Sequence, residues 1–240
     1  MLFGLMGGVA AAGAASWLGY NCYAPGSQLY GSTLFAGDDP RAISLTFDDG
    51  PNDPHTLRLL DVLAKYNVKA TFFLVGKYVK QRPEIARAVV AAGHALGNHT
   101  YSHPNLLLCS GKRIYSELRD CARAIKDNTG IDVALFRPPF GARRPAVLNA
   151  ARGLHYTTVM WNVTCFDWSA TSSQAIEARA HRHIAKQTNQ GKIVLLHDGG
   201  HLTMGTDRSH TVTAAGRLIA RYQSEGYKFL TIPQIRRRDL

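Results

Sequence analysis

The sequence predicts an α/β domain in which about seven parallel strands form a closed or nearly closed barrel. After residue 40, short β-rich runs alternate regularly with amphipathic helical patterns. This alternation is typical of βαβ units, whose strands run parallel to one another. The chain has 240 residues, of which 45% are hydrophobic and 19% charged, as expected of a globular domain with a large core.

Seven β-rich runs and six helical patterns account for the chain from residue 43 onward. The predicted strands are Ile43–Phe47, Ala70–Val75, Ala95–Asn98, Val133–Arg137, Thr157–Trp161, Lys192–His197 and Lys228–Thr231. The predicted helices are Thr56–Tyr66, Pro83–Ala92, Lys112–Asn128, Pro145–Arg152, Ser173–Thr188 and Thr211–Glu225. Pro83 suits the first turn of a helix, Gly93 suits the position after its end, and Ser110 is placed to cap the next helix.

The first 37 residues carry no charged side chain. Residues 2–18 are apolar and rich in Gly and Ala, as in an export signal or an uncleaved membrane anchor. We therefore expect residues 1–37 to be a signal or anchor plus linker, and residues 38–240 to be a folded domain outside the cytoplasm. A cytoplasmic chain is the alternative.

The net charge of +11 comes from 28 Lys and Arg against 17 Asp and Glu. Such a balance fits nucleic acid, anionic envelope polymers or acidic lipid headgroups. The sequence has no nucleic-acid-binding motif, and its basic residues are dispersed. We therefore expect no nucleic-acid partner, whereas the oligomeric state is left open.

The four cysteines, Cys22, Cys109, Cys121 and Cys165, form no CxxC pair. This spacing argues against a cysteine-based zinc site. Cys109 and Cys121 are candidate disulfide partners in an exported domain, and a reduced Cys121 in the core is the alternative.

Seven polar residues gather at the C-terminal ends of the predicted strands. In chain order they are Asp48, Asp49, His99, His103, Arg137, Asp167 and His197. Barrels of parallel strands build their active sites at this end. The sequence therefore predicts that these residues form one site.

The residue types at this end suggest metal-assisted acid–base chemistry. Asp48 and Asp49 are adjacent carboxylates, which repel each other unless a cation neutralises one of them. His99 and His103 are four residues apart and would share a metal if the segment turned as a helix. Two histidines, one carboxylate and an open position are typical of catalytic zinc. A turn cap and ordinary core or surface histidines are the alternatives.

Two loops and a strand end add further candidates. The prolines of Arg137–Gly141 make this loop rigid, and we expect a carboxylate partner for Arg137 and a backbone NH of Phe140 that faces a ligand oxygen. The segment Trp161–Trp168 mixes aromatic and polar residues, which suits stacking on sugars, although tryptophan in a barrel also serves as core. His197 is a candidate acid or base because a histidine titrates near neutrality.

In five motifs the chain resembles the polysaccharide deacetylase family, the NodB-homology carbohydrate esterases of family 4. The motifs are Thr46–Pro51, His99–His103, Arg137–Phe140, the segment that ends in Asp167-Trp168, and Leu195–His197. They follow the family's order over about residues 41–233. The resemblance implies a distorted (β/α) barrel, in agreement with the predicted strands.

The resemblance also implies a metal and a base. Asp49, His99 and His103 would bind a divalent metal, usually Zn²⁺ in this family and alternatively Co²⁺. Asp48 would be the general base, and Arg137 would orient it.

The remaining motif residues are matched to proton donation and substrate binding. His197 would be the general acid, held by Asp167. The backbone NH of Phe140 would stabilise the oxyanion, and Trp168 and Leu195 would line the pocket of the acetyl methyl group.

The function implied is metal-dependent N-deacetylation of an acetylated envelope glycan such as peptidoglycan, a chitin-like polymer or a capsule. An O-acetyl esterase, or a deacetylase of a lipid-linked or small-molecule substrate, is one alternative. A non-catalytic carbohydrate-binding relative is another, because Thr164 stands where the family commonly has an additional Asp and Asn162 precedes it.

Overall fold

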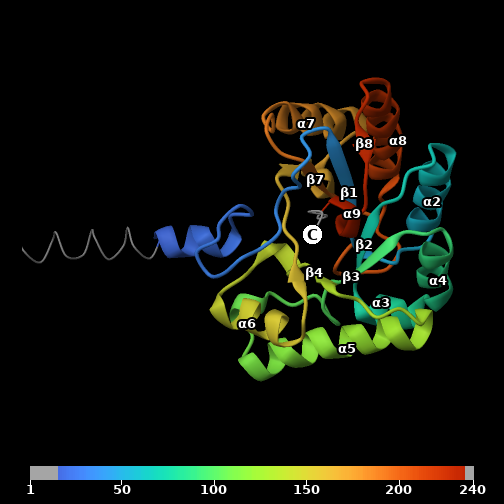
Figure 1. Cartoon of the computed structure of the whole chain (residues 1–240). Helices are drawn as coiled ribbons and strands as arrows, with labels where there is room; N and C mark the ends of the chain where they lie inside the picture. Colours follow the sequence, from blue (N-terminus) through green and yellow to red (C-terminus); the bar gives the residue numbers. More distant parts are fainter. Residues whose placement is uncertain (1–15, 236–240) are drawn as a thin grey trace, which may run out of the picture.

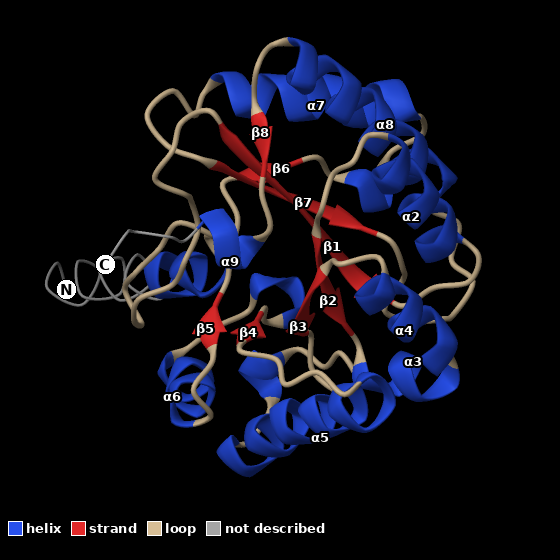
Figure 2. Ribbon diagram, turned by 45° about the vertical axis from the view of Figure 1, so that its right-hand side comes forward, coloured by secondary structure: helices blue, strands red, loops and turns tan. Residues whose placement is uncertain are grey.

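Eight parallel strands form a curled sheet at the centre of the computed structural model, which describes residues 16–235. Figure 2 shows the strands inside and the helices around them. The strands are β1 (Ala42–Gly50), β2 (Thr71–Leu74), β3 (Ala95–Asn98), β4 (Leu135–Phe136), β5 (Thr157–Thr158), β6 (Val163–Thr164), β7 (Lys192–His197) and β8 (Lys228–Phe229). The predicted barrel of parallel strands is thereby confirmed.

The order of the strands leaves one seam in the barrel. The path runs β5-β4-β3-β2-β1-β7-β6, and β8 pairs with the beginning of β1. No ladder joins β5 to β6 among the described residues. Instead, Leu34 forms a parallel bridge with Val159, and Gly37 forms an antiparallel bridge with Gly191. The segment before β1 therefore lies across the seam.

Helices cover the outside of the sheet (Figure 1). They are α2 (His55–Lys65), α3 (Gly76–Gln81), α4 (Pro83–Ala91), α5 (Gly111–Thr129), α6 (Pro145–Gly153), α7 (Ser173–Ala185) and α8 (Ser209–Ser224). The short helix α9 (Ile232–Ile235) lies instead within the curl of the sheet (Figure 2), where Ile232 and Ile235 cluster with Phe73 and Ile193. Ser110 caps α5, since its Oγ accepts a hydrogen bond from the backbone NH of Arg113 at 3.2 Å. Gly130 ends the same helix in the left-handed conformation, with φ of 77°.

The main core lies between the sheet and these helices. Every residue of β1 is buried, and Phe47 packs in one cluster with Leu59 and Leu63 of α2 and Ile219 of α8. Burying a side chain of this size contributes about 1.5–3 kcal/mol each. The burial fixes the position of β1 and hence of the carboxylates at its end.

The structure differs from the prediction in short elements. The strand β6 was not predicted because it has two residues and is held only by Val163↔Val194 and Thr164↔Leu195. The six-residue helix α3 was also missed. The predicted strand Thr157–Trp161 ends at Thr158, since Val159 bridges to Leu34 instead of continuing the ladder.

The predicted membrane anchor, residues 2–18, lies almost wholly outside the described residues. Among the helices in residues 16–235, none has the length and apolar character needed to cross a bilayer. The end of the helix of residues 16–23 contacts the rest of the domain, because Cys22 O accepts a hydrogen bond from the NH of Arg143 at 2.9 Å.

All four cysteines are free. Cys121 is buried in α5, and its thiol contacts the carbonyl oxygen of Leu74 at 3.3 Å. The structure therefore contradicts the disulfide between Cys109 and Cys121 and agrees with the reduced core cysteine. Burial raises the pKa of the Cys121 thiol to about 12.

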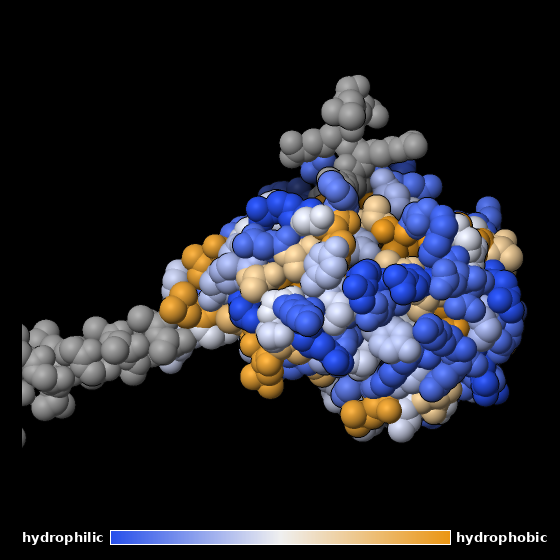
Figure 3. Space-filling view, turned by 90° about the horizontal axis from the view of Figure 1, so that it is seen from below, coloured by the Kyte–Doolittle hydropathy of each residue, from blue (hydrophilic) through white to orange (hydrophobic). Residues whose placement is uncertain are grey.

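One face of the molecule carries hydrophilic and apolar residues together. Figure 3 shows the face formed by α5 and α6, which is mainly hydrophilic with apolar residues scattered across it. The apolar residues form no continuous patch on this face.

Candidate active site

The two carboxylates of β1 face one cavity because the strand bulges between them. Asp48 pairs with Phe73 of β2, whereas the next pair in the ladder is Gly50 with Leu74, so Asp49 is left unpaired. Asp49 has φ of 72°, in the left-handed region. Successive side chains of a regular strand point to opposite faces, and the bulge cancels this alternation. Both carboxylates consequently line the same cavity of about 340 Å³.

Asp49, His99 and His103 converge on one point of this cavity. Their candidate ligand atoms all lie within 4.8 Å of one another. Asp49 Oδ1 lies 3.1 Å from His103 Nε2 and 3.6 Å from His99 Nε2. In the described residues, Asp49 Oδ1 and His103 Nδ1 are buried without a hydrogen bond. Because such an oxygen is costly to bury alone, the donor set of two nitrogens and one oxygen fits a divalent cation.

The protonation of these side chains suits metal ligation. His99 Nδ1 lies 2.8 Å from the carbonyl oxygen of Arg137, so Nδ1 carries the hydrogen and the lone pair of Nε2 faces Asp49. Burial lowers the pKa of His99 to about 4, against the opposing charge of Asp48. Burial alone would raise the pKa of Asp49, but His103 outweighs it and holds that pKa below its ordinary value.

The two histidines meet for a different reason from the predicted one. Residues 99–105 form no helix. Thr100 and His103 have φ of 66° and 59°, and side chains hold the turns. Asn98 Oδ1 accepts from Thr100 NH at 2.8 Å, and Thr100 Oγ1 accepts from His103 NH at 3.1 Å. The helical interpretation was wrong, because hydrogen bonds from short polar side chains compete with helix formation here.

Arg137 provides the partner expected for Asp48. Its guanidinium is fully buried, and Nη1 donates to Asp48 Oδ1 at 2.8 Å and to Thr46 Oγ1 at 2.7 Å. The same group lies 4.2 Å above the ring of Phe73. Burial lowers the pKa of Arg137 and Asp48 opposes this. One oxygen of Asp48 is thus fixed by Arg137, and Oδ2 lies 3.7 Å from His99 Nε2.

His197 and Asp167 form a second buried pair across the site. His197 Nδ1 lies 2.9 Å from Asp167 Oδ1, and Asp167 Oδ2 accepts from the NH of His197 and from Thr211 Oγ1. Burial lowers the pKa of His197, but the charge of Asp167 reverses this and raises the pKa to about 9. The imidazole is therefore a cation near neutral pH whose Nε2 is left for another acceptor.

The cavity brings together eight of the ten predicted site residues, while Arg137 and Asp167 lie behind its wall. Phe140 and Trp168 stand at the cavity wall with about half of their surfaces exposed, and Leu195 is buried beneath. Phe140 has φ of 59° and ψ of 8°, a conformation that costs a non-glycine residue roughly 1–2 kcal/mol.

Three further residues line the cavity. Gly141 and Trp161 belong to the candidate segments Arg137–Gly141 and Trp161–Trp168, whereas His201 was not predicted. The ring of His201 stacks on His103, with centroids 4.9 Å apart, and lies 5.3 Å from that of Phe140. Its position comes from the loop after β7, and the only signal in the sequence is the Gly199-Gly200 pair that precedes it.

Asn162 and Thr164, which departed from the family pattern, lie outside this cavity. Asn162 Oδ1 accepts from Ile193 NH at 2.8 Å, and its Nδ2 donates to Gly191 O at 3.0 Å. Asn162 therefore fastens the chain before β6 to β7, and Thr164 continues that pairing.

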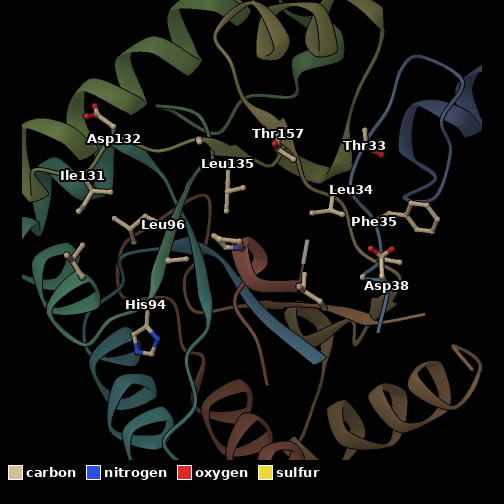
Figure 4. A pocket seen from close by; sticks show the side chains of 17 residues that line it. Thr33, Leu34, Phe35, Asp38, His94, Leu96, Ile131, Asp132, Leu135 and Thr157 are labelled. Atoms are coloured by element: carbon tan, nitrogen blue, oxygen red, sulfur yellow. The ribbon is translucent and has the colours of Figure 1, made fainter. Parts of the chain in front are cut away.

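A second cavity of about 970 Å³ lies around the N-terminal end of β3 and contains none of the predicted site residues (Figure 4). Leu34, Leu96 and Leu135 contribute to its lining. His94 is buried here, where its Nδ1 accepts from Ala70 NH at 3.1 Å and burial lowers its pKa to about 4.

Known proteins are similar to this chain in sequence and in fold. Residues 36–159 match the family model described as polysaccharide deacetylase. A peptidoglycan-N-acetylglucosamine deacetylase of Bacillus cereus is 33% identical over 202 residues, which is 83% of this chain and 90% of that protein. A chitooligosaccharide deacetylase of Sinorhizobium fredii is 36% identical over 205 residues, 83% of this chain and 94% of that protein.

A solved structure of a CE4 family pseudoenzyme from Bacillus anthracis superposes with a TM-score of 0.77 at 31% identity, and covers 87% of this chain and 71% of that one. The similarity therefore extends over both sequence and fold. From these matches, the chain belongs to the polysaccharide deacetylase family.

Proposed function

We propose that this protein is a divalent-metal-dependent hydrolase that removes N-acetyl groups from an envelope glycan outside the cytoplasm. The observation that carries the proposal is the placement of two buried pairs, Asp48–Arg137 and Asp167–His197, around a cavity with an orphaned Asp49 oxygen. The names of the relatives, which include a peptidoglycan and a chitooligosaccharide deacetylase, support N-acetylated sugars as the substrate class.

In this proposal, Asp49, His99 and His103 would hold a divalent cation such as Zn²⁺. The bound cation would supply Lewis-acid polarisation and make a water molecule more acidic. Co²⁺ has the same preference for this donor set and is the alternative.

The chain's own residues then move the protons. Asp48 takes a proton from the attacking water, because Arg137 binds Oδ1 and leaves Oδ2 towards His99. The backbone NH of Phe140 donates to the acetyl oxygen as negative charge develops on it. His197 gives its Nε2 proton to the departing amine, since Asp167 holds the opposite nitrogen.

The wall of the cavity selects the acyl group. Trp168 stands edge-on to His197 with ring centroids 5.1 Å apart, and Leu195 lies beneath. Together they offer an apolar pocket for one methyl group beside the proton donor. Larger acyl groups meet the indole, which favours acetyl substrates.

The test is acetate release from N-acetylglucosamine oligomers by the full chain with added Zn²⁺ or Co²⁺. Asp48→Asn is expected to lose nearly all activity and to retain its metal, measured by elemental analysis. Asp61→Asn, which changes an exposed aspartate of α2, is the matched control and should be unaffected. Full activity in Asp48→Asn would refute the assignment of Asp48 as the general base.

A screen over acetylated glycans separates the alternatives. Release from O-acetyl esters, or from a lipid-linked or small-molecule amide alone, would replace the envelope N-deacetylase. Absence of release from every compound by a metal-loaded protein would favour a carbohydrate-binding relative. A reporter fused at the C-terminus and active only in the cytoplasm would contradict the proposed export.

A further inference from the structure

The turn that carries Phe140 depends on contacts from outside itself. Phe140 and Gly141 are both in the left-handed region, with φ of 59° and 68°. The ring of Phe140 lies 4.8 Å from that of His103, centroid to centroid. A displacement of this turn therefore moves both the backbone NH of Phe140, which is the proposed oxyanion donor, and the ring that packs against His103.

Arg143, two residues beyond the turn, is 1% exposed and lies outside the lining of the cavity. Its Nη1 donates to the carbonyl oxygen of Gly141 at 3.1 Å. Its Nη2 donates to carbonyl oxygens of the segment before the barrel, namely those of Ala24, Pro25 and Ser27. One guanidinium thus joins two parts of the chain that are more than 110 residues apart.

The partners of Arg143 explain why this position requires an arginine. Its described partners are backbone carbonyls, and no carboxylate in residues 16–235 forms an ion pair with it. A buried cation without an acid depends on keeping all of its hydrogen bonds. The planar fork of arginine also fixes the angle between its acceptors, which a lysine does not. The NH of Arg143 adds a bond to Cys22 O at 2.9 Å.

We infer that Arg143 is a positioning residue that holds the Phe140 turn against residues 22–27. Residues 22–27 then contribute to the geometry of the active site without lining its cavity. The inference rests on the proposed function, in which the NH of Phe140 faces the acetyl oxygen.

The experiment compares Arg143→Met, Arg143→Lys and the wild type as full chains. Arg123→Met, which changes an exposed arginine of α5, is the matched control. The readouts are kcat and KM for acetate release, Zn²⁺ affinity, and hydrogen–deuterium exchange of peptides that cover residues 22–27 and 138–142.

Arg143→Met is expected to lower kcat at least tenfold, to change KM less than threefold, and to leave Zn²⁺ affinity unchanged. Exchange should rise in both peptides together, and Arg143→Lys should fall between Arg143→Met and the wild type. If Arg143→Met does not fold, Arg143→Lys decides by the same readouts. A folded variant with normal kcat and normal exchange overturns the inference.

The exchange readout also keeps two failures apart. If the wild type releases no acetate from any substrate, the proposed function fails and kcat carries no information. Coupled exchange of residues 22–27 and 138–142 on replacing Arg143 would then still support the connection, and uncoupled exchange would reject it.

Discussion

Replacing Asp167 by Asn tests how the candidate acid is kept protonated. Asp167 lies 2.9 Å from His197 Nδ1, and its charge is the largest of the contributions that raise the pKa of His197 to about 9 despite burial. Asparagine has nearly the same shape but no charge. Burial then prevails, and the pKa of His197 is expected at or below its ordinary value of 6.5.

The size of the effect follows from these two values. With a pKa of about 9, roughly 97% of His197 is protonated at pH 7.5, whereas a pKa of about 6.5 leaves roughly 9%. At pH 5.5 both forms are more than roughly 90% protonated. The ratio of kcat/KM between Asp167→Asn and wild type should therefore fall about tenfold between pH 5.5 and 7.5.

The assay is acetate release across pH 5–10 at constant metal. Thr211→Ala is the matched control, because it removes the hydrogen bond at 2.9 Å to Asp167 Oδ2 and leaves the charge in place. At alkaline pH, the dependence of kcat/KM on pH for Thr211→Ala should stay near that of the wild type. A ratio for Asp167→Asn that does not vary with pH would refute this account of His197.

Three further outcomes are expected. Zn²⁺ at 100 times its Kd should raise the free energy of unfolding by about 2.7 kcal/mol in thermal melts, and Asp49→Asn should lose most of this gain. Burial raises the pKa of Asp198 from 3.8 to about 7, so the wild type should lose up to about 4 kcal/mol of stability as pH rises through that window. Denaturant titrations of the metal-free proteins should show a flatter dependence of stability on pH for Asp198→Asn. Gly141→Ala places a methyl group 2.9 Å from Trp161 at a φ of 68°, and it should lower the free energy of unfolding by at least about 1 kcal/mol and remove much of kcat. Gly111→Ala, with open space around it, should change neither quantity. Equal melting temperatures for the two variants would contradict the predicted strain.

The strand ends were predictable because apolar runs stop there at polar residues. The run from Lys192 ends at His197, as β7 does. The run from Ile43 stops at Asp48, whereas β1 continues to Gly50. In parallel strands these ends share one rim. The candidate site followed from this geometry, and the family motifs added a role for each residue.

Other features depend on tertiary contacts that leave no pattern in the sequence. The bulge at Asp49 depends on its neighbours in the sheet, and His201 reaches the cavity only through its loop. Arg143 has backbone carbonyls as partners, which any residue type supplies. Such contacts cannot be inferred from residue identity, which explains why these residues were missed.

The seam between β5 and β6 has a consequence for any shortened version of this protein. Leu34 and Gly37 occupy backbone groups near Val159 and at Gly191 that no other strand covers among residues 16–235. A protein that began after residue 37 would present these groups as open sheet edges. Open edges pair with strands of other molecules. Self-association of such a shortened protein would then result from the loss of the segment that bridges the seam, even with every catalytic side chain in place.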